Sequence, residues 1–294
     1  MILSGKKINV LVTGASGQLG RAIKNNLLSN HNYNFFFKSK AELNISSYNS
    51  IKRICLNHKI DLIINSAAYT NVDDSEFCKE ISNLVNNEYI KNIIKVCREL
   101  SIKLIHISTD YVFDGNKKKP YVENDEVNPL NNYGISKFNG EKQIVNSNLK
   151  NSIIIRTSWL YSNYGNNFVL NIINQLREGK EIKVTDNEVG SPTNADDLAL
   201  LLIKLISKIE NKKTEIYHFA NIGYCSRYNF ANEIVKLCNS NEKIKRKKSQ
   251  NNFTKRPKFS ALNSEKIMNK FGIEPKDWKI SLNEYINKYG FNEI

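Results

Sequence analysis

The sequence predicts an α/β protein with a doubly wound parallel sheet and a smaller C-terminal substrate-binding lobe. Three observations lead to this prediction. Short apolar runs alternate with amphipathic helical stretches through the first half of the 294 residues. A glycine-rich turn joins the first apolar run to the first helical stretch. After residue 157 the alternation gives way to shorter strands and more frequent helices.

The first half of the chain supplies the strands and helices of the sheet. Apolar runs predict strands at 8–12, 33–37, 61–64, 103–107 and 152–156. Helical periodicity predicts helices at 18–29, 48–57, 78–100 and 133–146. Strands that alternate with helices form right-handed βαβ units, so the expected arrangement is Rossmann-like.

The second half is expected to divide between the sheet and the lobe. Helices are expected at 168–177, 195–209, 227–239, 264–271 and 281–289, with short strands at 182–184 and 215–219. Residues 243–258 have no periodicity and predict a loop. We therefore assign 1–157 to the larger domain, with 184–220 contributing to it, and assign 158–183 and 221–294 to the lobe.

Charge and composition exclude several classes of protein. The net charge is +14, and residues 236–258 alone hold nine cations and one anion. Only 8 of the 43 cations are Arg, and no nucleic-acid-binding module is recognisable, so we expect small phosphorylated ligands rather than nucleic acid. No stretch of about 18 residues is continuously apolar, so no membrane span is expected. The five Cys and four His are scattered, which predicts no metal site, no disulfides and a cytoplasmic protein.

The glycine-rich turn predicts a dinucleotide site. Gly14, Gly17 and Gly20 form G-x-x-G-x-x-G between a strand and a helix, with Gln18 and Leu19 inside the motif. Glycines allow a tight turn and close approach of the backbone to a phosphate, and the N–H groups of the helix start can bind it.

The residues after the second strand bear on the choice of cofactor. An acidic residue there typically binds the ribose of NADH. This sequence has Lys38, Ser39 and Lys40 instead, and a cation can bind the 2′-phosphate of NADPH. NADPH is therefore favoured over NADH. The alternative is that these two lysines are exposed and have no role in a lysine-rich chain.

Tyr133 and Lys137 form a Y-x-x-x-K motif, which places both side chains on one helix face. An ammonium group close to a phenol should lower the Tyr133 pKa, so that Tyr133 can donate a proton to a ketone that accepts a hydride. Thr109 ends the fourth strand, at the sheet edge where ligands bind, and can polarise the same carbonyl. The motif alone is common on solvated helices, but its place after this strand is more specific.

Taken together, the motifs resemble the extended short-chain dehydrogenases/reductases, and more narrowly the dTDP-4-dehydrorhamnose reductase family, over essentially the whole chain. The motifs that carry the resemblance are residues 14–20, 65–73, 108–115, 129–137, 156–161, 190–193, 217–221 and 256–260.

The resemblance implies NAD(P)H-dependent reduction of the C4 ketone of dTDP-4-dehydro-β-L-rhamnose to dTDP-L-rhamnose. It implies that Tyr133 is the acid, Lys137 its partner and Thr109 the hydroxyl that orients the carbonyl. Cofactor contacts would come from Gly14, Gly17, Gln18, Leu19, Lys38, Asn44, Ile45, Ala67, Ala68, Tyr69, Thr70, Tyr133 and Lys137. Substrate contacts would come from Thr109, Asp110, Trp159 and Arg256.

Three stretches depart from the pattern of the family. Asn44 stands where an Asp is frequent, Asn187 and Glu188 stand where Asp and Gln are frequent, and Arg227 stands where an aromatic residue is frequent. The first departure concerns adenine contacts, and the other two concern the lobe that selects the sugar nucleotide. The sequence therefore leaves the exact sugar and nucleoside base open.

Other functions remain as alternatives. An epimerase or a reductase of another nucleotide-linked 4-keto sugar would keep the fold, whereas a dehydratase is disfavoured because Tyr111, and not a carboxylate, follows Asp110. A regulatory subunit that binds cofactor without turnover would need neither Tyr133 nor Lys137. The sequence also leaves open whether the chain forms a homodimer and whether it depends on magnesium.

Overall fold

A computed structural model describes residues 7–27, 32–247 and 253–293. Its centre is a six-stranded parallel sheet in the order β10-β5-β4-β3-β1-β2, which confirms the doubly wound fold. The strands are β1 Ile8–Thr13, β2 Tyr33–Lys38, β3 Leu62–Asn65, β4 Lys103–Thr109, β5 Ser152–Thr157 and β10 Glu215–His218. The strand order reverses between β1 and β3, which makes this the point at the carboxyl edge where a ligand is expected.

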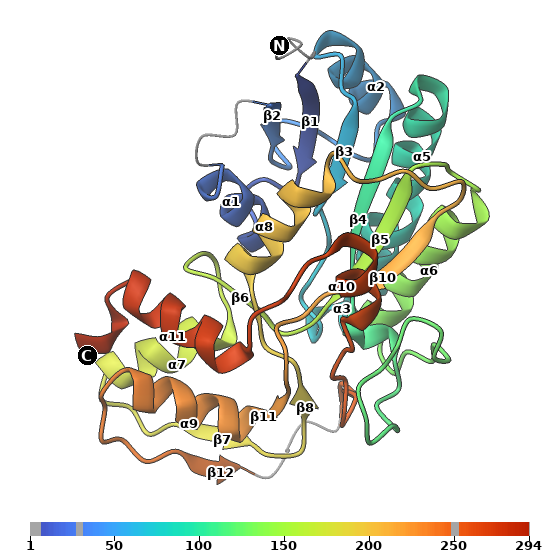
Figure 1. Cartoon of the computed structure of the whole chain (residues 1–294). Helices are drawn as coiled ribbons and strands as arrows, with labels where there is room; N and C mark the ends of the chain where they lie inside the picture. The colour runs from blue at the N-terminus through green and yellow to red at the C-terminus, as the bar shows by residue number, and fades with distance from the viewer. Residues whose placement is uncertain (1–6, 28–31, 248–252, 294) are drawn as a thin grey trace.

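The two faces of the sheet are covered by different helices, because side chains alternate along each strand. Val10 and Val12 of β1 pack into one apolar cluster, whereas Leu11 between them packs into another. The first cluster includes α1 Gln18–Asn25 and α8 Ala195–Leu205. The second includes α2 Tyr48–Asn57, α5 Tyr89–Leu100 and α6 Asn132–Asn146. Figure 1 shows α8 on one side of the sheet and α5 and α6 on the other.

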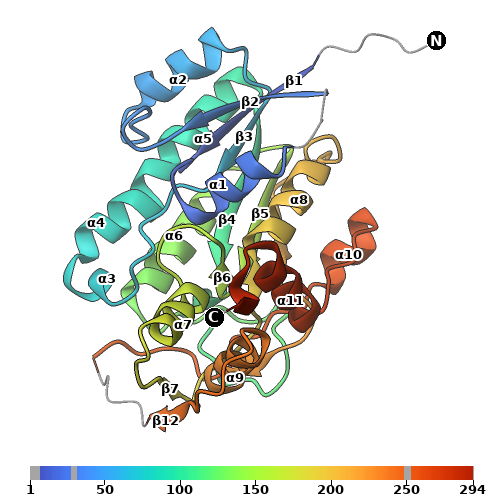
Figure 2. The same ribbon diagram turned by 90° about the vertical axis from the view of Figure 1, so that its left-hand side faces the viewer.

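The smaller lobe has an apolar cluster of its own, rich in aromatic side chains such as Phe230, Trp278 and Tyr285. Its helices are α7 Phe168–Arg177, α9 Arg227–Leu237 and α11 Trp278–Lys288. Its strands form three short pairs: β6 Leu160–Tyr161 with β9 Thr193–Asn194, β7 Lys183–Thr185 with β12 Lys245–Lys247, and β8 Val189–Gly190 with β11 Cys225–Ser226. The strands of the sheet point toward this lobe (Figures 1 and 2).

Two segments lie on the other side of the expected division between domain and lobe. β7, β8 and β9 lie in or next to 184–220, the range expected to contribute to the sheet, and they pair with β12, β11 and β6. Conversely, α10 Glu265–Phe271 packs on the sheet cluster through Ile267 and Phe271. The strand β12 also occupies part of the expected loop at 243–258, of which 248–252 lie outside the described residues. Strand pairing across the lobe is a long-range contact, so local periodicity did not indicate it.

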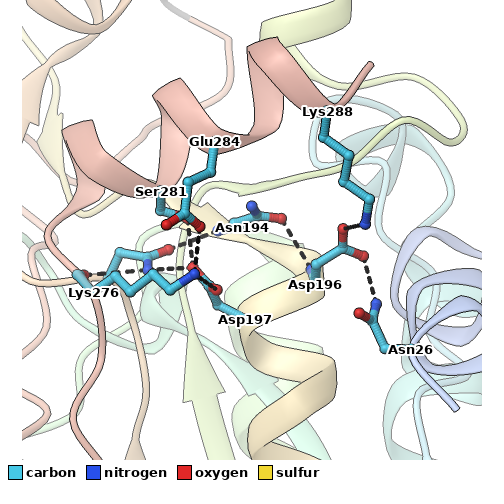
Figure 3. A network of polar contacts seen from close by, with 9 residues as sticks. Asn26, Asn194, Asp196, Asp197, Lys276, Ser281, Glu284 and Lys288 are labelled. Carbon is cyan, nitrogen blue, oxygen red and sulfur yellow. Dashed lines mark hydrogen bonds and ion pairs between the residues drawn. The ribbon is translucent and has the colours of Figure 1, made fainter. Parts of the chain in front are cut away.

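The start of α8 joins the larger domain to the lobe (Figure 3). Asp197 accepts hydrogen bonds from Asn221 Nδ2 at 2.7 Å and from Ser281 Oγ of α11. Asp196 accepts from Asn26 Nδ2 at 2.8 Å and from Lys288 Nζ of α11 at 2.7 Å. Two adjacent carboxylates thus fix α11 against the helices that cover the sheet.

The long helix expected at 78–100 is divided into three parts. It consists of α4 Lys79–Asn83, a π-helical turn η1 Leu84–Glu88, and α5. A short helix, α3 Asp74–Phe77, precedes them. The π-turn lies against α6, where a Cβ on Gly140 would come within 2.1 Å of the Asn86 carbonyl oxygen. Such turns are often found at functional sites.

In the part of the chain that the structure describes, no helix is both long and apolar enough to cross a membrane.

Candidate active site

The glycine-rich turn lies between the carboxyl end of β1 and the start of α1. Gly14 has a φ of +69°, and a Cβ there would be 2.7 Å from the Ala67 backbone nitrogen. A Cβ on Gly20 would be 2.6 Å from the Gly14 carbonyl oxygen. Gly17 precedes α1 and has no side chain with which to cap it, so the N–H groups of the first turn are left for an anion. The turn therefore fits the pyrophosphate of a dinucleotide.

Gln18 and Leu19 follow this turn and have different surroundings. The Leu19 side chain is buried in the core, so only its backbone can reach a phosphate. Gln18 Oε1 accepts a hydrogen bond from Ser162 Oγ of the lobe at 2.9 Å. The first turn of α1 is thus tied to the lobe as well as to the sheet.

A carboxylate that local sequence reasoning missed, that of Glu42, lies four residues beyond the end of β2. Lys38 is the last residue of β2, and its carbonyl oxygen accepts from Ala15 N at 3.2 Å. Glu42 Oε2 accepts from Ser39 N at 2.8 Å and from Ser39 Oγ at 2.6 Å. The Ser39 hydrogen bonds hold the Glu42 pKa below its usual value, and the Lys38 charge adds to this effect. Lys38 remains the proposed contact for a 2′-phosphate.

Two segments predicted to contact the cofactor are fixed mainly by local hydrogen bonds. Asn44 Oδ1 accepts from Ser46 N at 3.0 Å and from Ser46 Oγ at 2.7 Å, so the Asn44 side chain stabilises its own turn. The carbonyl oxygen of Ile45 accepts from Asn92 Nδ2 of α5 at 3.2 Å. An adenine contact by this segment therefore stays a prediction.

Residues 67–70 follow β3 and lie beside the glycine turn. Asn86, in the π-turn η1, accepts from Tyr69 N at 2.8 Å and donates to the Tyr69 carbonyl oxygen at 2.9 Å. It also donates to Ser136 Oγ of α6 at 3.0 Å. Ala68 is half-buried and Thr70 is exposed. Asn86 thus links the segment predicted to line the cofactor to the helix that carries Tyr133, and no local pattern indicated this link.

The Tyr133 phenol lies at the start of α6, opposite the end of β4. Asn131 caps this helix by accepting from Gly134 N at 2.8 Å. Tyr133 forms a hydrogen bond with Thr109. Thr109 Oγ1 also donates to Asp110 Oδ1 at 3.1 Å. Burial raises the Tyr133 pKa, which the Thr109 hydrogen bond partly offsets, so the phenol is neutral and can donate its proton.

Lys137 is buried one turn further along α6. Its Nζ donates to the Ile107 carbonyl oxygen at 2.7 Å and lies 3.5 Å from His106 Nε2. Burial lowers the Lys137 pKa to about 8, against the effect of Glu141, which raises it. The expected lowering of the Tyr133 pKa by Lys137 is wrong for this structure, because burial of the phenol dominates.

A buried polar chain extends from Lys137 toward β1. His106 Nδ1 lies 3.0 Å from Asn65 Nδ2, and Asn65 Oδ1 accepts from Thr13 Oγ1 at 2.6 Å. Burial, with the Lys137 charge, lowers the pKa of His106, so this imidazole is neutral. These residues come from the carboxyl ends of β1 and β3 and from β4. Sequence reasoning placed Asn65 in a motif and did not single out His106.

Asp110 joins the catalytic strand to the lobe. Its Oδ2 accepts from Ser260 Oγ at 2.5 Å, while its Oδ1 binds Thr109. Burial raises the Asp110 pKa to about 6, against hydrogen bonds from Ser260 and Thr109 that lower it. The last residue of the motif at 256–260 is therefore connected to Tyr133 through Asp110 and Thr109.

Arg256 and Trp159 lie in segments that approach the site from the lobe. Arg256 Nη2 donates to Asp73 Oδ1 at 2.7 Å, and its charge lies near Tyr111, whose ring packs edge-on against Tyr133. Trp159 has a φ of +42°, and its ring face is covered by the Arg227 guanidinium. Asp73 and Arg227 are partners that the sequence did not indicate.

The described residues contain no group of three or more His, Cys, Asp or Glu side chains that could hold a metal ion.

The chain is similar in sequence and structure to known proteins. The family model for the RmlD substrate binding domain matches residues 8–291. The dTDP-4-dehydrorhamnose reductase of Aggregatibacter actinomycetemcomitans is 36% identical over 284 residues, which is 93% of this chain and 96% of that protein. The spore coat polysaccharide biosynthesis protein SpsK of Bacillus subtilis is 35% identical and covers 95% of this chain and 97% of its own length.

Solved structures agree over nearly the whole chain. A dTDP-4-dehydrorhamnose reductase from Clostridium acetobutylicum superposes with a TM-score of 0.89 at 35% identity, covering 96% of this chain and 100% of that one. The Bacillus anthracis enzyme of the same name, in complex with NADP, has a TM-score of 0.90 at 31% identity with the same coverage. The chain therefore belongs to the RmlD substrate-binding-domain family, the family of the dTDP-4-dehydrorhamnose reductases.

Proposed function

We propose that this chain is an NADPH-dependent reductase that converts the C4 ketone of dTDP-4-dehydro-β-L-rhamnose to the hydroxyl of dTDP-L-rhamnose. The observation that carries the proposal is the hydrogen bond between Tyr133 and Thr109 at the carboxyl end of β4. It brings a neutral phenol and a hydroxyl close together. A substrate carbonyl oxygen could accept hydrogen bonds from both groups in place of the bond between them. Membership of the reductase family supplies the class of substrate.

The residues around the glycine turn fit a dinucleotide. The uncapped start of α1 would hold its pyrophosphate, and Lys38 would bind a 2′-phosphate. Residues 67–70 would lie along the cofactor, held by Asn86. When bound, NADPH supplies the hydride that reduces the C4 carbon.

The side chains of the protein supply the proton and orient the carbonyl. Tyr133 donates its phenolic proton to the C4 oxygen as that oxygen gains negative charge, so hydride and proton together convert the ketone to an alcohol. Thr109 donates a second hydrogen bond to the same oxygen after turning from Asp110. Lys137 is held by the Ile107 carbonyl oxygen below the phenol on the same helix face and would bind the nicotinamide ribose.

We further propose that the enzyme acts in the cytoplasm on a small-molecule sugar nucleotide, with no nucleic-acid partner. All five cysteines are free in the structure, and four of them are buried, which suits a reducing compartment. The basic surface suits phosphorylated small ligands.

A panel of 4-keto sugar nucleotides tests this function. Purified protein is mixed with NADPH or NADH and with dTDP-, UDP- or GDP-linked 4-keto-6-deoxy sugars, and loss of the reduced cofactor is followed by absorbance. We expect the highest kcat/KM with dTDP-4-dehydro-β-L-rhamnose and NADPH. Turnover with only a GDP- or UDP-sugar would change the substrate. NADPH binding without turnover of any member would contradict the assignment as a reductase.

A further inference from the structure

Arg227 and Glu188 are brought together by the short ribbon of β8 and β11. Ser226 pairs with Val189 in an antiparallel register. Arg227, which follows Ser226, therefore lies opposite Glu188, which precedes Val189. Arg227 N donates to the Glu188 carbonyl oxygen at 3.1 Å, and Arg227 Nε lies 3.7 Å from Glu188 Oε2. Both residues are among those at which the lobe departs from the pattern of the family.

The Trp159 ring stacks against the Arg227 guanidinium. The Arg227 guanidinium carbon lies 3.5 Å from the Trp159 ring centroid and 5.0 Å from that of Phe168. On Gly190 a Cβ would come within 2.4 Å of the indole, so the indole cannot move toward β8. A planar cation that is stacked in this way keeps one orientation, with its N–H groups directed outward from the edge of the stack.

The side chains of Arg227 and Glu188 have donors and acceptors without a hydrogen-bond partner among the described residues. No described residue accepts a hydrogen bond from the Arg227 side chain or donates one to the Glu188 carboxylate, and their separation of 3.7 Å is too long for a hydrogen bond. Both side chains are largely buried, with 17% and 19% of their surface exposed. The free donors and acceptors of the pair are not among the enclosed, unpartnered polar atoms of the described residues, so a ligand can reach them.

The pair lies beside the reacting centre. Trp159 is two residues beyond Thr157, which is the register partner of Thr109. The Arg227 charge also acts on Asp110 and Tyr111, the two residues that follow Thr109. If the C4 carbonyl of the sugar binds Thr109, its ring would extend toward Trp159. The ring would then contact the Arg227 guanidinium, which covers the indole.

We propose that Arg227 and Glu188 form a subsite for the ring hydroxyls of the sugar, in which the guanidinium donates to one hydroxyl oxygen and the carboxylate accepts from a neighbouring hydroxyl. A donor beside an acceptor matches a vicinal diol. The opposite charges nearly cancel, and the carboxylate would repel a phosphate, so the diphosphate is not the ligand of this pair. The inference rests on the proposed function for the identity of the sugar nucleotide.

Binding measurements separate the sugar from the diphosphate. The affinities of the NADPH-loaded protein for dTDP-L-rhamnose and for dTDP, which lacks the sugar, are measured by calorimetry. We expect Arg227→Ala and Glu188→Gln to weaken dTDP-L-rhamnose binding by about ten- to a hundredfold, the effect of losing hydrogen bonds to a charged group. Binding of dTDP should change by less than about twofold, since the rest of the site is intact.

Arg246→Ala is the matched control. Arg246 also stacks on an aromatic ring, that of Tyr228 at 4.4 Å, and pairs with the Asp186 carboxylate at 3.0 Å, but it is 67% exposed. This variant should bind both ligands like the wild type. Thermal unfolding and NADPH affinity of each variant report whether the lobe has kept its fold. The conservative Arg227→Lys variant keeps the charge but not the planar fork, and should recover only part of the affinity.

Two outcomes would overturn the subsite. One is unchanged dTDP-L-rhamnose affinity in a folded Arg227→Ala protein. The other is an equal loss of affinity for dTDP-L-rhamnose and dTDP, which would make Arg227 a phosphate contact or a structural residue. Failure of the proposed function looks different, because the wild-type protein would then bind dTDP-L-rhamnose no better than dTDP and would reduce no 4-keto sugar in the panel.

Discussion

Tyr133 is the residue on which the proposed chemistry depends most directly. Its hydroxyl is hydrogen-bonded to Thr109, and Thr109 donates to Asp110, which also accepts from Ser260 of the lobe. This chain of contacts holds the phenol at the end of β4. Because burial raises the Tyr133 pKa, the proton stays on the phenol at neutral pH until charge develops on the substrate oxygen.

Replacement of Tyr133 by Phe removes this proton and leaves the ring. We expect Tyr133→Phe to lower kcat by about two to four orders of magnitude, the usual contribution of a positioned general acid, with NADPH affinity within about threefold of the wild type. The measurement is steady-state reduction of the sugar nucleotide together with titration of bound NADPH.

Tyr285→Phe is the control for the loss of a buried hydroxyl. Tyr285 is fully buried in the lobe, and among the described residues its hydroxyl has no hydrogen-bond partner. Its replacement should leave kcat unchanged. A Tyr133→Phe enzyme that kept near-normal kcat would show that another group donates the proton.

Strand β10 carries a buried histidine that links the edge of the sheet to its neighbours. His218 Nδ1 donates to the Tyr121 carbonyl oxygen at 3.0 Å, and His218 Nε2 lies 3.4 Å from Arg156 Nη1 of β5. Arg156 itself is held by Glu141 of α6 through hydrogen bonds of 2.7–3.2 Å. Burial, followed by the Arg156 charge, lowers the His218 pKa to about 3. Asp125 raises this pKa and the Lys266 charge lowers it.

This histidine makes the stability of the fold depend on pH. The folded state holds His218 neutral, so its contribution is complete above the unfolded pKa of about 6.5 and is lost as the pH falls toward 3. Between pH 6.5 and pH 5 the wild type should lose about 2 kcal/mol of unfolding free energy from this group. Urea unfolding at pH 7 and at pH 5 measures the loss.

His218→Gln should remove this part of the pH dependence while being less stable at pH 7, because a buried hydrogen bond and packing are altered. His58→Gln, at the half-exposed C-terminal end of α2, serves as the control and should keep the wild-type slope. Identical slopes in the wild type and in His218→Gln would show that His218 titrates alike in both states.

At the level of elements, the sequence predicted the strands and turns whose formation depends on residues close to one another in the chain. The apolar runs and glycines gave every strand of the central sheet and the turn at Gly14, because side-chain alternation and φ preference are local properties. The π-turn that positions Asn86 was missed, since it depends on Gly140 of another helix. The Arg227–Glu188 pair was noted only as two unusual residues, because their contact requires the pairing of β8 with β11.

For the molecule as a whole, the division into domain and lobe determines where the chemistry lies. The strands end at the lobe, and the motif at 256–260 returns from the lobe to Asp110 and Asp73. The Asp196 and Asp197 contacts hold α11 against α8 and α1, so the two sides of the site are fixed relative to each other (Figure 3). A substrate that bridges the two parts is thus positioned by both.

The net charge of +14 acts on ligands before they reach this site. NADPH and NADH differ by one phosphate, so a general positive field should favour association of NADPH more strongly at low salt. We expect kcat/KM for NADPH to fall more steeply than that for NADH as sodium chloride rises from about 10 to about 150 mM, because the screening length shortens from about 30 to about 8 Å.

Charge reversal far from the site distinguishes this field from a local contact. Lys150, Lys212 and Lys213 are exposed and precede β5 and β10, at the edge of the sheet opposite the candidate site. Their replacement by Glu lowers the net charge by six, and the slope of log kcat/KM for NADPH against ionic strength should become shallower, with kcat unchanged. An unaltered slope in the triple variant would place the salt dependence in direct contacts such as Lys38, because a long-range field must weaken when the net charge is lowered.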